Sequence, residues 1–183
     1  ARATTCPRHD VPASPAPSYS RPMSEHVSYT LIGDVAHLAI DDGKANALSP
    51  AMQSAIHASL DRAEADDAAV VLCSGEKLFC GGFDLGIVAG GGPAVGEMVR
   101  GGFELTMRLL SFRRPVVIAC GGHAIAMGAF LLLAGDLRIG AAGSYRVQAN
   151  EVAIGMSMPF AALALMNGRL TPSAVQQAAV LAA

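Results

Sequence analysis

Charged and aromatic residues are scarce in this sequence, at 15% and 5% of 183 residues, and tryptophan is absent. Ordinary soluble domains carry about 25% charged residues. Because 52% of the residues are hydrophobic, we expect most helices to be buried or an apolar face to be covered by another subunit. The formal net charge is only −2, so no basic surface favours nucleic acid or an anionic membrane as a partner.

Potential metal ligands and nucleophiles are few and scattered. The four cysteines form no CxxC pair, and Cys73 and Cys120 lie in apolar, strand-like runs where a thiol behaves as a small core residue. This pattern predicts reduced cysteines in a cytoplasmic protein rather than a disulfide framework. The five histidines lack the spacing of zinc ligands, so no metal site is expected. The sequence also lacks a G-x-S-x-G elbow and a P-loop.

One apolar run, residues 116–133, is long enough to cross a bilayer. Pro115 precedes it and Gly121-Gly122 interrupts it, while its first half is β-branched and its second half is helix-forming. We therefore predict a buried strand, a glycine-containing turn and a buried helix over residues 115–136. No secretory signal is predicted, because the N-terminal residues contain no continuous apolar segment.

The two ends of the sequence differ from its middle. Residues 1–22 are rich in Pro, Ala and Ser and are predicted to be a disordered tail. We interpret Met23 as the native start, which makes this tail non-native; a genuine flexible tail is the alternative. Residues 23–183 are predicted to form one domain. Its last helix, capped by Thr171-Pro172, still runs at Ala183, so we expect an incomplete C-terminal helical region.

The apolar pattern predicts alternating strands and helices. The expected strands are residues 27–32, 35–40, 68–73, 137–139 and 145–148, and the expected helices are residues 50–66, 95–110, 159–168 and 172 onward. Glycine turns at Gly81-Gly82 and near Gly128 each follow a strand and precede a helix. Such turns direct free N–H groups and a helix N-terminus to one place, where they can stabilise a developing negative charge.

Few carboxylates are placed to act near these turns. Glu151 lies between the polar residues 148–150 and the apolar residues 152–154. A carboxyl group that enters an apolar environment has a raised pKa, which suits a proton shuttle near pH 7. A salt-bridged or helix-capping glutamate is the alternative. Asp84 and Asp136 are interpreted as turn or capping residues.

Several short motifs occur in a fixed order along the chain. They are Asn46-Ala47-Leu48, Phe79-Cys80-Gly81-Gly82-Phe83-Asp84-Leu85, Pro115-Val116-Val117-Ile118-Ala119, Gly122-His123-Ala124, Met127-Gly128-Ala129 and Asn150-Glu151. Their spacing is similar to that of the crotonase superfamily, the enoyl-CoA hydratases and isomerases, and resembles most closely actinobacterial proteins of that kind. The resemblance covers nearly everything from Val27 onward.

The resemblance implies an α/β (α+β) fold built as a spiral of ββα units, assembled as a homotrimer or hexamer. It implies an acyl-CoA substrate bound bent across the two glycine turns, and no cofactor besides the coenzyme A of the substrate. The backbone N–H groups of Phe83 and Met127 would form the oxyanion hole, and Glu151 would carry the proton. The substrate would contact Ala47, Leu48, Gly81, Gly82, Asp84, Gly128 and Phe130.

The sequence departs from the family pattern at one position of chemical importance. Hydratases of this family usually carry two glutamates, and the first of them falls at Phe130. A single remaining carboxylate favours Δ3-Δ2-enoyl-CoA isomerisation. A 2-enoyl-CoA hydratase of fatty-acid β-oxidation and a non-catalytic acyl-CoA-binding subunit are the alternatives. Phe83 and Met127 replace small residues, so we expect a narrowed acyl pocket. His123 is interpreted as a hydrogen-bonded turn residue.

Overall fold

The structure is a computed structural model that describes residues 21–22 and 24–181. The tail expected to be disordered therefore lies outside the described residues, apart from Arg21–Pro22, and so does the expected start at Met23. The described strands are β1 (Arg21–Pro22), β2 (Val27–Ile32), β3 (Val35–Ile40), β4 (Ala69–Ser74), β5 (Lys77–Cys80), β6 (Val116–Cys120), β7 (Gly122–Ile125), β8 (Leu137–Gly140) and β9 (Val147–Gln148).

The described helices confirm most of the predicted ones. They are α1 (Pro50–Ala65), α2 (Leu85–Gly90), α3 (Pro93–Leu110), α4 (Met127–Ala134), α5 (Phe160–Arg169) and α6 (Pro172–Gln176), with a 3-10 turn η1 (Val152–Ile154) and a π-helical segment η2 (Gln177–Leu181). Ser49 caps α1 by accepting a hydrogen bond from Met52 N, and Pro50 begins the helix, as the sequence predicts.

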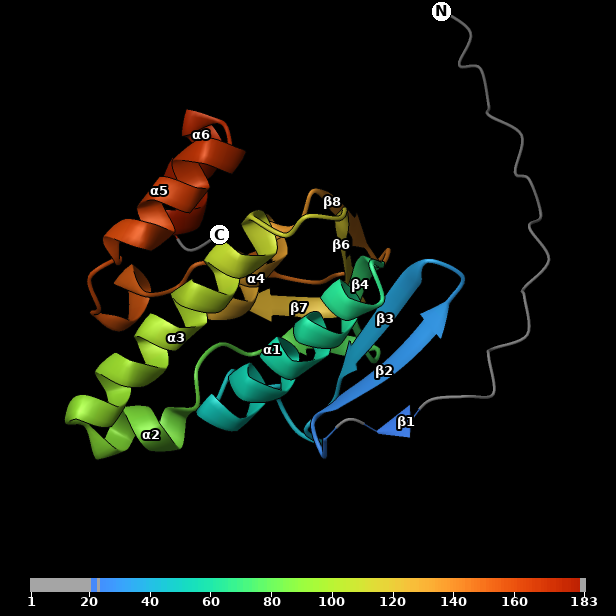
Figure 1. The fold of residues 1–183 in the computed structure, drawn as a ribbon. Helices are drawn as coiled ribbons and strands as arrows, with labels where there is room; N and C mark the ends of the chain where they lie inside the picture. Colours follow the sequence, from blue (N-terminus) through green and yellow to red (C-terminus); the bar gives the residue numbers. More distant parts are fainter. Residues whose placement is uncertain (1–20, 23, 182–183) are drawn as a thin grey trace, which may run out of the picture.

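The strands form two sheets that are built by the same repeated unit. The larger sheet has the order β1-β2-β3-β4-β6-β8 and the smaller one the order β5-β7-β9. Each of the pairs β4–β5, β6–β7 and β8–β9 gives its first strand to the larger sheet and its second strand to the smaller sheet. Neighbouring strands from successive pairs run parallel. This is the spiral of ββα units that the sequence led us to expect (Figure 1).

The prediction for residues 115–136 was wrong in one respect. The expected turn between one strand and one helix contains a second strand, β7, which pairs with β5. Gly122 lies opposite Lys77, and a Cβ at Gly122 would lie 1.9 Å from the Lys77 carbonyl carbon. The glycine therefore marks close approach of two strands rather than a turn. The short helix α2 was not predicted, because its residues carry no amphipathic pattern.

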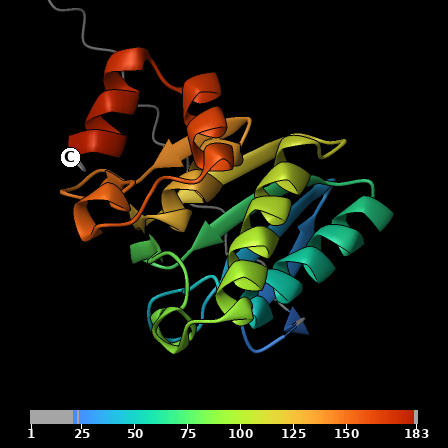
Figure 2. The same cartoon turned by 90° about the vertical axis from the view of Figure 1, so that its left-hand side faces the viewer.

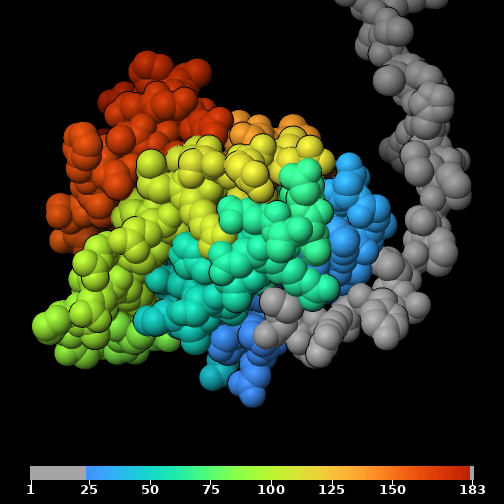
Figure 3. Space-filling view, in the orientation of Figure 1, coloured from blue at the N-terminus to red at the C-terminus, as the bar shows by residue number. Residues whose placement is uncertain are grey.

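Helices cover the larger sheet and the glycine turns. Helix α1 contacts β2, β3 and β4, and α3 contacts α1 on one side and α4 on the other (Figures 1 and 2). Arg108 of α3 links the two outer helices by donating hydrogen bonds to His57 O at 3.1 Å and to an Asp61 carboxylate oxygen at 2.6 Å. On this face, side chains of α1 and α3 form one closed surface (Figure 3).

Helix α4 is the centre of the core, since all eight of its residues are buried. No described helix is both long enough and apolar enough to cross a membrane. The C-terminal helix α5 packs on α4, but the outer surface of this region is apolar. Phe160 is 87% exposed, and Val180 and Leu181 are also exposed, as is Met107 of α3, which lines one surface pocket together with Phe160. The low share of charged residues in the sequence is therefore reflected in apolar side chains that are exposed on the surface of this region.

Candidate active site

The two glycine turns meet in space. Gly82 adopts a left-handed conformation with φ of +99°, and a Cβ at this position would lie 3.1 Å from Ala126 Cβ and 3.7 Å from Met127 N. The turn at Gly82 therefore lies against the first residue of α4. In the part of the chain that the structure describes, neither Phe83 N–H nor Met127 N–H donates a hydrogen bond to a protein acceptor. Both amides remain available to a ligand.

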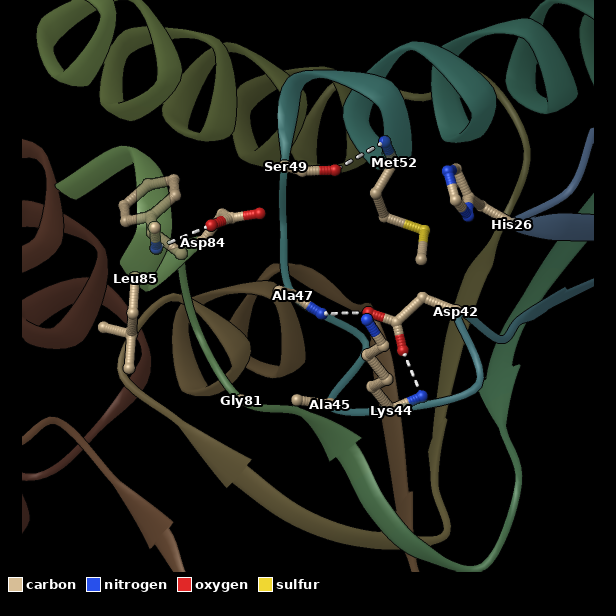
Figure 4. Close-up of a pocket in the computed structure, with 12 residues that line it drawn as sticks. His26, Asp42, Lys44, Ala45, Ala47, Ser49, Met52, Gly81, Asp84 and Leu85 are labelled. Atoms are coloured by element: carbon tan, nitrogen blue, oxygen red, sulfur yellow. Dashed lines mark hydrogen bonds between the residues drawn. The ribbon is translucent and has the colours of Figure 1, made fainter. Parts of the chain in front are cut away.

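Asp42 organises the loop that precedes α1. Its carboxylate accepts hydrogen bonds from the backbone N–H groups of Lys44 at 2.8 Å, Asn46 at 2.8 Å and Ala47 at 3.0 Å; Figure 4 shows two of these contacts. Burial alone would raise the pKa of Asp42, but these three hydrogen bonds outweigh it and hold the pKa below its ordinary value. The carboxylate acts as a fixed anion around which the loop folds.

The loop is fastened to the first glycine turn from both sides. Asn46, with φ of +48°, donates from its amide nitrogen to Phe79 O at 3.2 Å. Leu48 N donates to Gly82 O at 2.7 Å, and Gly81 N donates to Ala45 O at 2.9 Å. Loop and turn therefore form one hydrogen-bonded unit. The sequence analysis used residues 46–48 as a motif but did not assign the loop-forming roles of Asp42 and Asn46.

An open groove of about 480 Å³ lies beside this unit. Four residues predicted to contact the substrate or hold its oxyanion line it together, namely Ala47, Gly81, Phe83 and Asp84. The groove also contains His26 and Lys44, which the sequence analysis missed because nothing in their local pattern links them to the glycine turns (Figure 4). Asp84 accepts hydrogen bonds from Gly86 N and Ile87 N, so its carboxylate caps α2, which agrees with the turn or capping role interpreted from the sequence.

The side chains of two other predicted residues do not line the groove. Leu48 and Met127 are fully buried in the core, so any contact with a substrate would be made by their main chains. The Met127 side chain therefore does not narrow the groove. The Phe83 ring lies close to α3, because a Cβ at Gly102 would lie 2.6 Å from Phe83 Cε1.

Gly128 brings α4 directly onto β5. A Cβ at Gly128 would lie 2.3 Å from Cys80 O and 2.9 Å from Cys80 Cβ, so only glycine allows this approach. Burial raises the pKa of the Cys80 thiol to about 11. At neutral pH the thiol is protonated and acts as a core residue rather than as a nucleophile.

Glu151 lies shortly after strand β9, which pairs with β7, the strand that leads into the second glycine turn. Strand β9 runs parallel to β7, and Ala126 N donates to Gln148 O at 2.8 Å, which fixes the chain three residues before Glu151. The Oε2 atom of Glu151 is buried and has no hydrogen-bond partner, and neither has the Oδ1 atom of the neighbouring Asn150. Burial raises the pKa of the Glu151 carboxyl above its ordinary value of 4.5, although its own backbone N–H partly opposes this shift.

Phe130, which the resemblance places at the position of the first family glutamate, is only 2% exposed. Its ring packs on that of Phe103 with centroids 5.9 Å apart. Phe130 lines a separate cavity of about 230 Å³ with Ala149 and residues of the C-terminal helices, not the groove beside the glycine turns. No described group of three or more His, Cys, Asp or Glu side chains could hold a metal ion.

His123 lies on strand β7 rather than in a turn. Its Nδ1 atom accepts a hydrogen bond from Arg146 N at 2.9 Å, and its ring meets that of Tyr145 edge to face. This hydrogen bond agrees with the prediction that His123 is a hydrogen-bonded residue, and the ring also contacts Tyr145.

Comparisons with known proteins agree with this architecture. A sequence model described as enoyl-CoA hydratase/isomerase matches residues 32–183. The fold is similar to that of a Mycobacterium tuberculosis enoyl-CoA isomerase, with 55% identity and a TM-score of 0.83 over 87% of this chain and 70% of that one. A second structure of the same mycobacterial protein is described as a probable enoyl-CoA hydratase.

Curated relatives are more distant. A carnitinyl-CoA dehydratase of Proteus mirabilis is 31% identical over 120 residues, which are 64% of this chain and 46% of the relative. A probable enoyl-CoA hydratase of Rhodobacter capsulatus is 35% identical over 130 residues, or 69% and 51% of the two chains. The chain thus spans about half the length of these curated relatives. Since the family model matches most of its length, the chain belongs to the enoyl-CoA hydratase/isomerase family, the crotonase superfamily.

Proposed function

We propose that this chain acts on an acyl-CoA thioester through an enolate held by two backbone amides, with Glu151 as the only proton carrier. The α-proton of a thioester is too weakly acidic to leave unless the enolate oxygen is stabilised. The N–H groups of Phe83 and Met127 support this role, because they border the meeting point of the two glycine turns and have no acceptor in the described protein. The groove lined by Ala47, Gly81 and Asp84 would hold the thioester end of the substrate.

We propose Δ3-Δ2-enoyl-CoA isomerisation as the reaction. The Glu151 carboxylate takes the proton from C2 of a 3-enoyl thioester, and the electron pair moves through the conjugated system to the thioester oxygen. Glu151 then returns the same proton to C4, which leaves the double bond between C2 and C3. No atom is gained or lost, so no water and no further cofactor are needed.

The observation that carries this choice is the contrast between Glu151 and Phe130. Glu151 has a buried, unpartnered oxygen and a raised pKa, as expected of a group that alternates between acid and base near neutral pH. Phe130, at the position of the other family glutamate, is packed on Phe103 and can hold no water. Adding water across a double bond usually needs both carboxylates.

The test is Glu151→Gln, assayed with 3-enoyl-CoA and 2-enoyl-CoA thioesters. We expect the unchanged protein to isomerise the 3-enoyl thioester faster than it hydrates the 2-enoyl thioester. The variant should lose at least about 100-fold in turnover, the usual contribution of a general acid or base. Turnover of both thioesters at the original rates by the variant would remove Glu151 from the mechanism. Calorimetry with acyl-CoA distinguishes an inactive binding subunit, which would bind without turnover.

We also propose that the protein assembles as a homotrimer or hexamer. The exposed apolar side chains of the C-terminal region, with Phe160 as the most exposed, support a partner subunit on this face. Light scattering after size-exclusion chromatography would test this proposal, and a monodisperse monomer would contradict it.

A further inference from the structure

Two adjacent glycines in the middle of α3 are unfavourable for helix stability and need an explanation. At each position a side chain from another part of the chain fills the space where a Cβ would lie. A Cβ at Gly101 would lie 2.3 Å from Gln53 Oε1, and a Cβ at Gly102 would lie 2.6 and 2.8 Å from Cε1 and Cζ of Phe83. By contrast, Gly96 of the same helix has no atom within 4 Å of such a Cβ. Close packing therefore accounts for glycine at positions 101 and 102, but not at position 96.

The neighbours of these glycines are linked by hydrogen bonds to the loop and turn beside the groove. Gln53, seated at Gly101, donates from its amide nitrogen to Leu48 O at 3.1 Å and to Met98 O at 2.9 Å. Leu48 in turn donates to Gly82 O, next to Phe83. A Cβ at Gly102 would also approach Leu48 Cδ2 at 3.4 Å. The glycine pair thus forms a notch in α3 that receives the supports of the first glycine turn.

Phe83 borders two spaces, the groove and the notch at Gly102. Phe83 lines the groove, and its ring also occupies the space above Gly102. If a methyl group filled that space, the ring could escape only by turning toward the groove or by pulling the Phe83 backbone away from α4. The first movement would obstruct substrate binding, and the second would misalign the Phe83 N–H.

We propose that Gly102 is a positioning residue for the reaction. It provides the notch that holds the Phe83 ring against α3, and thereby keeps the groove open and the Phe83 N–H directed at the substrate carbonyl. This inference rests on the proposed role of that N–H group. It also explains how a bulky residue is accommodated at an oxyanion position, since the notch removes its ring from the path of the acyl group.

The test is a double-mutant cycle with Gly102→Ala and Phe83→Ala, using Gly96→Ala as the matched control. Gly102→Ala should raise KM for 3-enoyl-CoA and lower kcat/KM by about tenfold or more, because misplacement by about 1 Å can cost 100-fold in rate. In the Phe83→Ala background the same substitution should change kcat/KM less than about twofold, since no ring remains to collide. Gly96→Ala should leave kcat/KM unchanged.

Thermal unfolding of the same variants separates this inference from the proposed function. Gly102→Ala should lower Tm in the original background but not in the Phe83→Ala background, whatever reaction the protein performs. Equal losses of kcat/KM in both backgrounds, or no loss in either while Glu151→Gln is inactive, would overturn the role of Gly102. If Gly102→Ala alone does not fold, recovery of folding in the double variant supports the notch, and failure of the double variant overturns it.

Discussion

The contact between Gly128 and Cys80 offers a direct perturbation of the convergence of the two glycine turns. In Gly128→Ala, the new Cβ would lie 2.3 Å from Cys80 O, which is 1.1 Å short of the 3.4 Å at which ordinary contact begins. The obstacle is a backbone carbonyl in a strand, which cannot rotate away as a flexible side chain would. Helix α4 must therefore move by about 1 Å from β5, and Met127 N moves with it.

Two effects of different size should follow. Overpacking of this kind usually costs about 1–3 kcal/mol of stability, which a chemical denaturation curve would measure. A donor that acts at 2.7–3.1 Å is largely lost when it moves by about 1 Å, so kcat should fall about 100- to 1,000-fold. Substrate binding through the groove should change less than kcat, because no residue of α4 lines the groove.

Gly168→Ala on α5 provides the control for this experiment. A Cβ at Gly168 meets no atom within 4 Å, so this substitution should leave kcat unchanged and increase helix stability slightly. A Gly128→Ala variant that folds and retains kcat within about threefold of the original would refute the reasoning, since it would show that the position of Met127 N is not critical.

Three further predictions concern the supports of the site and the sheet. Tyr29 donates a 2.6 Å hydrogen bond to an Asp66 carboxylate oxygen from a fully buried position, so Tyr29→Phe should lower the free energy of unfolding by about 1.5–3 kcal/mol in urea titrations; a cost below about 0.5 kcal/mol would contradict this. Burial and the Arg108 guanidinium hold the pKa of His57 below its ordinary 6.5, so the unfolded chain protonates first and stability should fall as pH drops below 6.5. The fall should be smaller in His57→Gln, and identical pH dependence in both proteins would be the adverse result. Asp42→Ala removes the acceptor of three loop amides and should raise KM for an enoyl-CoA by about tenfold with a smaller effect on kcat; an unchanged KM would show that the loop holds its shape without the carboxylate.

Much of the fold could be predicted from the sequence because its signals are local. Ser49-Pro50 marks the start of α1, and Thr171 caps α6 by accepting from Ala174 N. The parallel strands of the larger sheet are apolar runs with clear boundaries. Strand β7 was missed because its pairing is non-local: the glycine at position 122 is required by Lys77, forty-five residues earlier in the chain, and a glycine inside an apolar run resembles a turn.

The sequence predicted only part of the candidate site, because some of its contacts join residues that are far apart in the chain. Family spacing pointed to Phe83, Met127 and Glu151, and the structure places the glycine turns that carry the first two side by side. The family spacing could not indicate where the Phe83 ring lies, because the ring occupies space that is free only because residue 102 is a glycine. Nor could it reveal the loop-forming role of Asp42, whose three hydrogen bonds depend on the backbone conformation of residues 42–47.

The most direct test of the central claim is the exchange of C2 protons of a saturated acyl-CoA with solvent deuterium, followed by proton NMR. Enolate formation requires only the two amides and one base, so this measurement does not depend on whether the natural reaction is isomerisation or hydration. We expect the unchanged protein to exchange these protons, and Glu151→Gln to do so at least about 100-fold more slowly. Exchange at the original rate by Glu151→Gln, or no exchange by the unchanged protein, would contradict the account.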